Sequence, residues 1–152
     1  MASNNGHIFE QEFKKSAPEG VYIKKLKVSG MNYKGGGNEG DYLVYQFPNL
    51  YIFELKSHKG KSIPFDRLRE VQIKGLTALG KIPGVKTGFI FNFRELEKTY
   101  FIHTEHIISY MTSGERKSFP IEWVEEVGVR LEHKKARTRY TYNLLKLLSE
   151  IK

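Results

Sequence analysis

Residues 40–56 decide how this chain folds, and they read Gly-Asp-Tyr-Leu-Val-Tyr-Gln-Phe-Pro-Asn-Leu-Tyr-Ile-Phe-Glu-Leu-Lys. Aromatic and β-branched residues flank the dipeptide at 48–49, which predicts two short strands joined by a turn. Because side chains alternate between the faces of a strand, Glu54 and Lys56 are expected to share one face. The hairpin folds Asp41 back beside Glu54. The sequence therefore predicts two carboxylates and one ammonium group at the edge of a sheet.

This group of side chains has a chemical use. Hard divalent cations such as Mg²⁺ take oxygen ligands, and one or two carboxylates usually hold them together with water and substrate phosphate. A lysine beside such an ion can orient an attacking water, help to deprotonate it, or stabilise charge on the phosphate. The alternative is a surface strand whose exposed face carries Glu54 and Lys56 as an ordinary ion pair. Since Asp41 joins them, both interpretations stay open until the rest of the chain is considered.

The composition limits the class of protein. The chain has 152 residues, of which 39% are hydrophobic and none is cysteine. This length and apolar content predict one domain over residues 1–152 with its own core. The lack of cysteine excludes disulfides, thiolate metal sites and a cysteine nucleophile, and it fits a reducing cytoplasm. No apolar run approaches the length of a membrane span, and residues 1–6 are unlike a signal peptide, so we expect a cytoplasmic protein.

The net charge of +8 points to a polyanionic partner. Nucleic acid is the first candidate and an anionic membrane surface is the second. A basic turn follows Lys56 directly, and the segment at 130–152 begins with cations interleaved with tyrosines, as nucleic-acid contact surfaces often do. The residues expected to contact DNA are Lys59, Lys61, Arg137, Arg139 and Tyr140. A solvated basic face is the alternative for the last segment.

Hydrophobic periodicity predicts the remaining elements. Helices are expected at residues 6–16, 63–79, 104–111 and 119–127 and at the end of the chain, and strands at 20–28, 86–93 and 99–103. Glu10 lies in the first of these helices, off its apolar stripe. In the second helix Val71 belongs to the stripe that should pack on the sheet, whereas Gln72 lies off it on the polar side. The glycine-rich residues 29–40 are expected to form a flexible loop that leads into Asp41.

Taken together, these residues resemble the RecU family of Holliday-junction resolvases, a branch of the PD-(D/E)xK nucleases. The central motif is Asp41 followed by Glu54-Leu55-Lys56. The resemblance also includes residues 6–10, 21–25, 61–64, 72–73, 88–90, 100–101, 116–118 and 139–142. It implies an α/β fold of the restriction-endonuclease-like type, with a mixed central β-sheet flanked by α-helices.

The resemblance also implies a site and an activity. Asp41 and Glu54 are expected to bind Mg²⁺, with Mn²⁺ as the alternative ion, and Gln72 is expected to contribute from its helix. Lys56 would stabilise the transition state, and Glu10 would support the metal site from the first helix. The family acts as a homodimer in which each site cuts one of two like strands of a four-way junction. A recombinase is a candidate protein partner.

The chain departs from the family pattern in the stretch before Asp41. The family usually inserts a long stalk there, which helps to engage the junction, whereas this chain has only residues 29–40. Glu39 stands where the family can offer a threonine as ligand. A compact phage-encoded member would account for both differences. Two alternatives remain open: a related nuclease that acts on other DNA structures, and a non-cleaving protein that binds junctions and modulates recombination.

Overall fold

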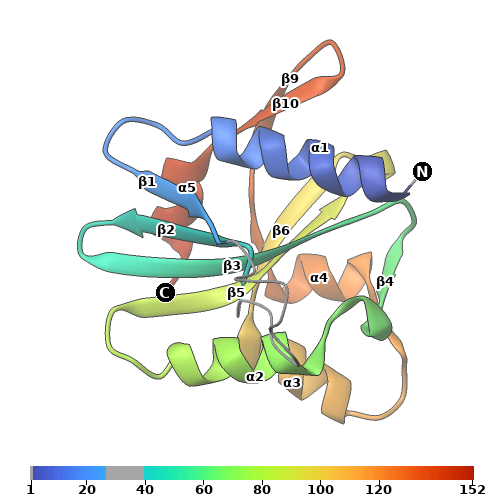
Figure 1. Ribbon diagram of the computed structural model, residues 1–152. Helices are drawn as coiled ribbons and strands as arrows, with labels where there is room; N and C mark the ends of the chain where they lie inside the picture. Colours follow the sequence, from blue (N-terminus) through green and yellow to red (C-terminus); the bar gives the residue numbers. More distant parts are fainter. Residues whose placement is uncertain (1, 27–39) are drawn as a thin grey trace, which may run out of the picture.

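The computed structural model describes residues 2–26 and 40–152, in which helices cover both faces of a mixed β-sheet (Figure 1). The main sheet has the spatial order β1-β2-β3-β5-β6-β8, with β1 (Tyr22–Lys25), β2 (Tyr42–Gln46), β3 (Asn49–His58), β5 (Val85–Phe93), β6 (Lys98–His103) and β8 (Val129–Arg130). The helices are α1 (Ala2–Lys15), α2 (Glu70–Leu79), α3 (Thr104–Thr112), α4 (Ile121–Val127) and α5 (Leu144–Glu150). Two short antiparallel ribbons pair β4 (Ser62–Pro64) with β7 (Ser118–Pro120), and β9 (His133–Ala136) with β10 (Arg139–Tyr142). The loop expected at 29–40 lies, except for Gly40, outside the described residues.

The predicted hairpin is confirmed as β2 and β3. These strands are antiparallel, with Tyr42 opposite Phe53, and β3 then pairs in parallel with β5. Since β5 pairs with β6 in the antiparallel sense, the sheet is mixed, as the sequence predicted. β3 continues after Phe53 to His58, past the start of β2. The segment of β3 that carries Glu54 and Lys56 therefore runs beyond the end of its neighbouring strand.

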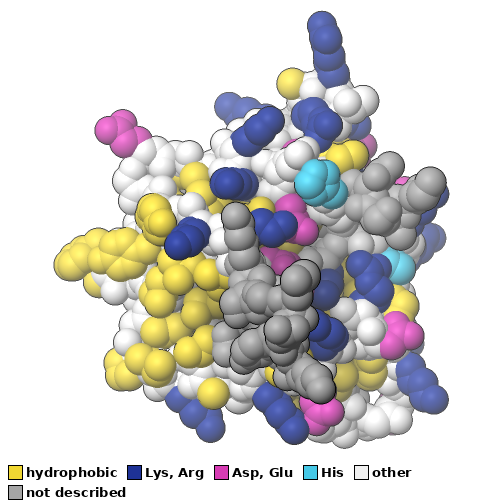
Figure 2. All heavy atoms as spheres, viewed as in Figure 1, with side chains coloured by type: hydrophobic (Ala, Val, Ile, Leu, Met, Phe, Trp, Pro, Cys, Tyr) yellow, Lys and Arg dark blue, Asp and Glu magenta, His cyan; other side chains and the backbone are white. Residues whose placement is uncertain are grey.

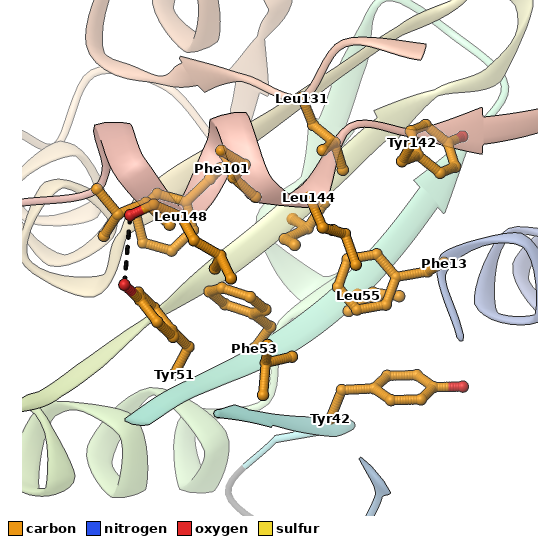
Figure 3. Close-up of a cluster of buried hydrophobic side chains, with 14 of the residues drawn as sticks. Phe13, Tyr42, Tyr51, Phe53, Leu55, Phe101, Leu131, Tyr142, Leu144 and Leu148 are labelled. Atoms are coloured by element: carbon orange, nitrogen blue, oxygen red, sulfur yellow. Dashed lines mark hydrogen bonds between the residues drawn. The ribbon is translucent and has the colours of Figure 1, made fainter. Parts of the chain in front are cut away.

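Two apolar clusters lie on the two faces of the sheet. On one face, α1 and α5 pack against side chains such as Phe53 and Phe101 (Figure 3). In this cluster the Tyr51 hydroxyl donates a hydrogen bond of 3.3 Å to the carbonyl of Leu148. On the other face, α2, α3 and α4 pack against side chains of β5 and β6. Burial on both faces explains the nearly continuous apolar sequence of the central strands.

The helix predicted at 63–79 is wrong in its first half. Residues 62–64 form β4, a 3₁₀ turn occupies residues 65–67, and α2 begins only at Glu70. Proline favours extended backbone in the residue before it, which explains the strand at this point. The buried face of the helix also differs from the predicted one. Val71 is 40% exposed, whereas Gln72 is 4% exposed.

The other predicted elements are mostly confirmed. The strands expected at 86–93 and 99–103 are β5 and β6, and the helices expected at 104–111 and 119–127 correspond to α3 and α4. The first helix is longer than expected, because it begins at Ala2. The β9–β10 ribbon was not predicted. In the part of the chain that the structure describes, the helices are too short or too polar to cross a bilayer.

Candidate active site

Asp41 directly precedes β2 and is held against the edge of β3. The backbone N–H of Asp41 donates to the carbonyl of Phe53 at 2.8 Å, and its Oδ2 accepts a hydrogen bond of 2.9 Å from the backbone N–H of Leu55. Gly40 permits this close approach, since a Cβ atom there would lie 3.0 Å from the Phe53 carbonyl oxygen. The hairpin thus places the Asp41 carboxylate beside Glu54, as the sequence predicted.

Glu54 and Lys56 form an ion pair on the same face of β3. Glu54 Oε2 lies 2.9 Å from Lys56 Nζ, and the Glu54 side chain is only 3% exposed. Its second oxygen, Oε1, is buried and has no hydrogen-bond partner within residues 2–26 and 40–152. A buried carboxylate oxygen without a partner costs free energy, because its interaction with water is lost and not replaced. A bound cation would supply the missing partner.

The electrostatics of the two carboxylates fit a cation site. The pKa of Glu54 is raised from its ordinary value of 4.5 to about 7. Burial is the main cause and the nearby Asp41 carboxylate is the second, whereas Lys56 opposes the change. Burial also raises the pKa of Asp41, against the opposing hydrogen bond from Leu55. Both carboxyl groups therefore hold protons more tightly than usual when no cation is present. A divalent cation relieves this repulsion by standing between the two groups.

A pocket of about 430 Å³ opens over this group. It is lined by Gly6, Glu10, Asp41, Glu54, Leu55, Lys56, Ser57 and Arg67. Glu10 reaches it from α1 and forms an ion pair of 2.6 Å with Lys25 at the end of β1. Figure 2 shows acidic side chains near the centre of the view with Lys and Arg side chains close by. The structure thus brings together the four residues predicted to be catalytic.

Gln72 also lies at this site rather than on the helix surface. Its side chain is close enough to Glu54 to lower the pKa of that carboxyl group. Among the described residues no three His, Cys, Asp or Glu side chains lie close enough to hold a metal ion by themselves. Two carboxylates are nevertheless sufficient for Mg²⁺ when water and substrate phosphate complete its ligands. Glu39, which the sequence placed near the site, lies outside the described residues.

Three residues of the site were not found from the sequence. The first is Leu55, through its backbone. The N–H and C=O of one strand residue point to the same side, and the Leu55 N–H binds Asp41, so the Leu55 carbonyl also points toward the edge of β3 where Asp41 lies. Arg67 lines the pocket and donates a hydrogen bond of 3.0 Å to the carbonyl of Ser57. Lys25 positions Glu10. Only Lys25 left a signal in the sequence, as one of several lysines on an alternating strand.

The residues expected to contact DNA differ in exposure. Lys59 and Lys61 are exposed in the turn between β3 and β4, and Arg137 and Arg139 are exposed on the β9–β10 ribbon. Tyr140 is only 8% exposed. Its hydroxyl donates a hydrogen bond of 2.9 Å to Glu97. The ring therefore packs inside the protein, and this burial is contrary to the base-stacking role expected from the sequence.

Known proteins are similar to this chain in sequence and in fold. Residues 38–147 match the family described as Recombination protein U, or RecU. The chain is 34% identical over 171 residues to the SPbeta prophage-derived uncharacterized protein YotM of Bacillus subtilis (strain 168), covering 99% of this chain and 88% of that protein. The fold is similar to that of Hjc, a Holliday junction resolvase from Archaeoglobus fulgidus, with a TM-score of 0.54 and 15% identity over 84% of this chain and 94% of that one.

These likenesses differ in what they establish. At 15% identity the similarity to Hjc concerns the fold alone, and it confirms the restriction-endonuclease-like α/β class that the sequence predicted. The sequence match to the family covers most of the chain, and the similarity to the Bacillus protein extends over nearly all of it. This protein therefore belongs to the Recombination protein U (RecU) family.

Proposed function

We propose that this protein is a Mg²⁺-dependent DNA endonuclease that resolves Holliday junctions in recombination and repair. Membership of the Recombination protein U family supports this function, and so does a fold shared with an archaeal Holliday junction resolvase. The observation that carries the proposal is the buried, unpartnered Oε1 of Glu54, next to Asp41 and Lys56. A protein that only bound DNA would gain nothing from carboxylates placed close to phosphates.

The residues of the site fit a hard divalent cation. Asp41 and Glu54 would hold Mg²⁺ with their carboxylates, assisted by the Gln72 side chain and the Leu55 carbonyl. Carboxylate and carbonyl oxygens suit Mg²⁺ and also Mn²⁺. The Gln72 amide oxygen accepts a hydrogen bond of 3.4 Å from the backbone N–H of Arg69, so it would exchange this partner for the cation. When bound, the cation would act as a Lewis acid that stabilises negative charge on the scissile phosphate.

The protein's own side chains would orient and stabilise the reacting groups. The ion pair with Glu54 fixes Lys56 Nζ at the pocket, where the ammonium group can donate hydrogen bonds to a phosphate oxygen or to the attacking water. Arg67 lines the same pocket and can contact a flanking phosphate, as can Lys59 and Lys61 in the following turn. Glu10, held by Lys25, would support the metal site from α1.

The assembly follows from the reaction. A Holliday junction is resolved by two symmetric nicks, so we propose a homodimer in which each protomer contributes one nuclease domain, formed by residues 1–152. A recombinase remains a candidate partner, and the cytoplasm is the proposed location. The prophage origin of the Bacillus relative supports the view that this short member is phage-encoded.

The test is cleavage of an end-labelled mobile four-way junction in Mg²⁺, with linear duplex as the competing substrate. The catalytic variant is Asp41→Asn. The chain has one other aspartate, Asp66, which is exposed on the 3₁₀ turn at 65–67, so Asp66→Asn is the matched control. We expect paired symmetric nicks near the crossover from the wild type and from Asp66→Asn, and none from Asp41→Asn.

Other outcomes would favour the alternatives. Cutting of linear duplex as fast as of the junction would indicate a nuclease for other DNA structures. Tight junction binding without any cleavage would indicate a protein that modulates recombination. If Asp41→Asn cut as well as the wild type, the site described here would not be the catalytic one.

A further inference from the structure

The β9–β10 ribbon projects from the body of the protein next to α1 (Figure 1). Arg139 pairs with Ala136, so the ribbon closes with a two-residue loop at 137–138. Strand alternation divides its side chains between two faces. The inner face carries His133, Lys135, Tyr140 and Tyr142, and the outer face carries Lys134, Ala136, Arg139 and Thr141.

The tip of the ribbon carries an arginine where glycine is expected. Arg137 has φ of 60°, in the left-handed region, and it is the first residue of the loop. Two-residue hairpin loops with positive φ at this position usually have glycine there, because a side chain makes the conformation unfavourable. Backbone conformations of this kind cluster at active sites, ligand clamps and switch segments. The conformation thus points to a use for the exposed guanidinium group.

The outer face and the tip form a basic surface. Lys134, Arg137 and Arg139 are exposed and form no ion pair with any residue in the described ranges, whereas Lys135 on the inner face is paired with Glu97 at 3.2 Å. A groove of about 290 Å³ between α1 and β10 continues this surface. It is lined by Gln11, Glu12, Lys15, Ser16, Arg139, Tyr140 and Thr141. Figure 2 shows Lys and Arg side chains gathered on the ribbon at the top of the view.

Buried contacts fix the ribbon to α1. Glu12 receives hydrogen bonds of 2.6 and 2.9 Å from Arg94 and one of 3.1 Å from the backbone N–H of Tyr140. Ser16 Oγ accepts another, of 2.9 Å, from the backbone N–H of Tyr142. The Glu12 charge in the groove is therefore compensated by Arg94. Because the ribbon is held in place before binding, it would lose little conformational entropy on contact with a ligand.

The same helix connects the ribbon to the catalytic pocket. Glu10 of α1 lines the pocket and Glu12 anchors the ribbon. Residues two positions apart in an α-helix are separated by about 200° around its axis. The side chains of Glu10 and Glu12 therefore leave α1 on nearly opposite sides. A domain of this length has a radius of gyration of about 15 Å. The ribbon and the pocket thus lie on one small domain and are joined by one helix.

We propose that the β9–β10 ribbon enters the major groove of one duplex arm, with Arg137 at base edges and Lys15, Lys134 and Arg139 at the flanking phosphates. Two strands lie about 4.8 Å apart and carry side chains, so the ribbon fits a groove about 12 Å wide but not the minor groove of about 6 Å. This inference rests on the proposed function, because it takes DNA as the substrate.

The test measures binding, not cleavage. A linear duplex and a four-way junction are titrated with protein in Ca²⁺, a hard cation that suits carboxylate sites, over a range of salt concentrations, and the DNA is checked to be intact. The variants are Arg137→Gly, which suits the left-handed backbone, and the double variant Lys134→Gln with Arg139→Gln. Lys74→Gln, on the exposed surface of α2, is the control. Methylation of guanine N7 then tests for contacts in the major groove.

We expect Arg137→Gly to bind DNA at least about fivefold more weakly and to be insensitive to N7 methylation, which weakens binding by the wild type. The double variant should lower the salt slope by about 1.8, and Lys74→Gln should leave the slope unchanged. If the ribbon variants bind like the wild type, or if N7 methylation has no effect on the wild type, the inference is wrong and the nuclease proposal is untouched. If the wild type binds no DNA, the proposed function itself fails.

Discussion

The pKa of Glu54 leads to a prediction about the metal-free protein. Replacing Glu54 by glutamine keeps the shape of the side chain and removes its charge. The wild-type carboxyl group, 3% exposed and next to Asp41, has its pKa raised from 4.5 to about 7. Between these two values the folded protein holds a proton that the unfolded chain has already released. Wild-type stability should therefore fall as pH rises from 4.5 to about 7, with no further contribution from this group above that range.

The magnitude follows from the same two values. A difference between 4.5 and about 7 corresponds to about 3 kcal/mol, at about 1.4 kcal/mol for each pH unit. The value of about 7 already includes the opposing effect of the Lys56 ion pair, so this pair is not subtracted again from the free energy. We expect Glu54→Gln to be close to the wild type in stability at pH 4.5 and to gain about 3 kcal/mol relative to it by pH 8.

The assay is urea unfolding followed by circular dichroism in EDTA at pH 4.5, 6 and 8. Glu126→Gln, at an exposed position of α4, is the control and should differ from the wild type by no more than about 0.5 kcal/mol at every pH. A free-energy difference between wild type and Glu54→Gln that stays constant from pH 4.5 to pH 8 would refute the reasoning. In that case Glu54 would be ionised in the folded protein without strain, and the argument for a cation site would lose its electrostatic basis.

Three further predictions concern the metal ion, the ribbon anchor and α2. Adding Mg²⁺ at ten times its dissociation constant should stabilise the wild type at pH 8 by about 1.4 kcal/mol and leave Glu54→Gln unchanged, as measured by unfolding. Arg94→Met should lower the free energy of unfolding by about 3 kcal/mol or more, because it leaves Glu12 buried without its charged partner. Lys74→Met, which removes an exposed ion pair, should lower it by less than about 1 kcal/mol. Denaturant midpoints measure the difference between the two variants. Leu76→Ala should cost at least about 2 kcal/mol and Val71→Ala less than about 1 kcal/mol, and comparable costs would contradict the observed orientation of α2.

The sequence predicted the hairpin of the candidate site well because its signals are local. The structure confirms the alternation of β3 and the position of Asp41, which depend on short-range geometry. The two-residue turn lies at 47–48, one residue earlier than predicted. The start and the orientation of α2 depend instead on contacts between residues far apart in the sequence. The Ile63–Pro64 segment pairs with β7, more than 50 residues later in the chain, and no local pattern reveals that contact. The periodicity of α2 therefore places Gln72 on the polar side, whereas the family resemblance places it at the site, and its buried side chain lies near Glu54.

The basic segment near the end of the chain shows a second limit of sequence reasoning. Its composition indicates a polyanionic ligand, but composition does not distinguish the outer face of a ribbon from the inner one. Burial separates them, since Tyr140 packs inward with Lys135 opposite it, while Arg139 points outward. The anchoring contacts join Glu12 to residues 82 and 128 positions away. Contacts over such distances become visible only in the folded chain.

Helix α1 relates these separate observations to one another. In the sequence Glu10 and Glu12 both look like solvated helix residues. The fold pairs Glu10 with the exposed Lys25 and Glu12 with the partly buried Arg94. Lys25 holds Glu10 at the pocket of the candidate site, and Arg94 with the Tyr140 backbone holds Glu12 at the ribbon. Because both contacts belong to one rigid helix, a shift of the ribbon would move α1 relative to the carboxylates of the hairpin. Helix α1 therefore links the position of the ribbon to that of the candidate site.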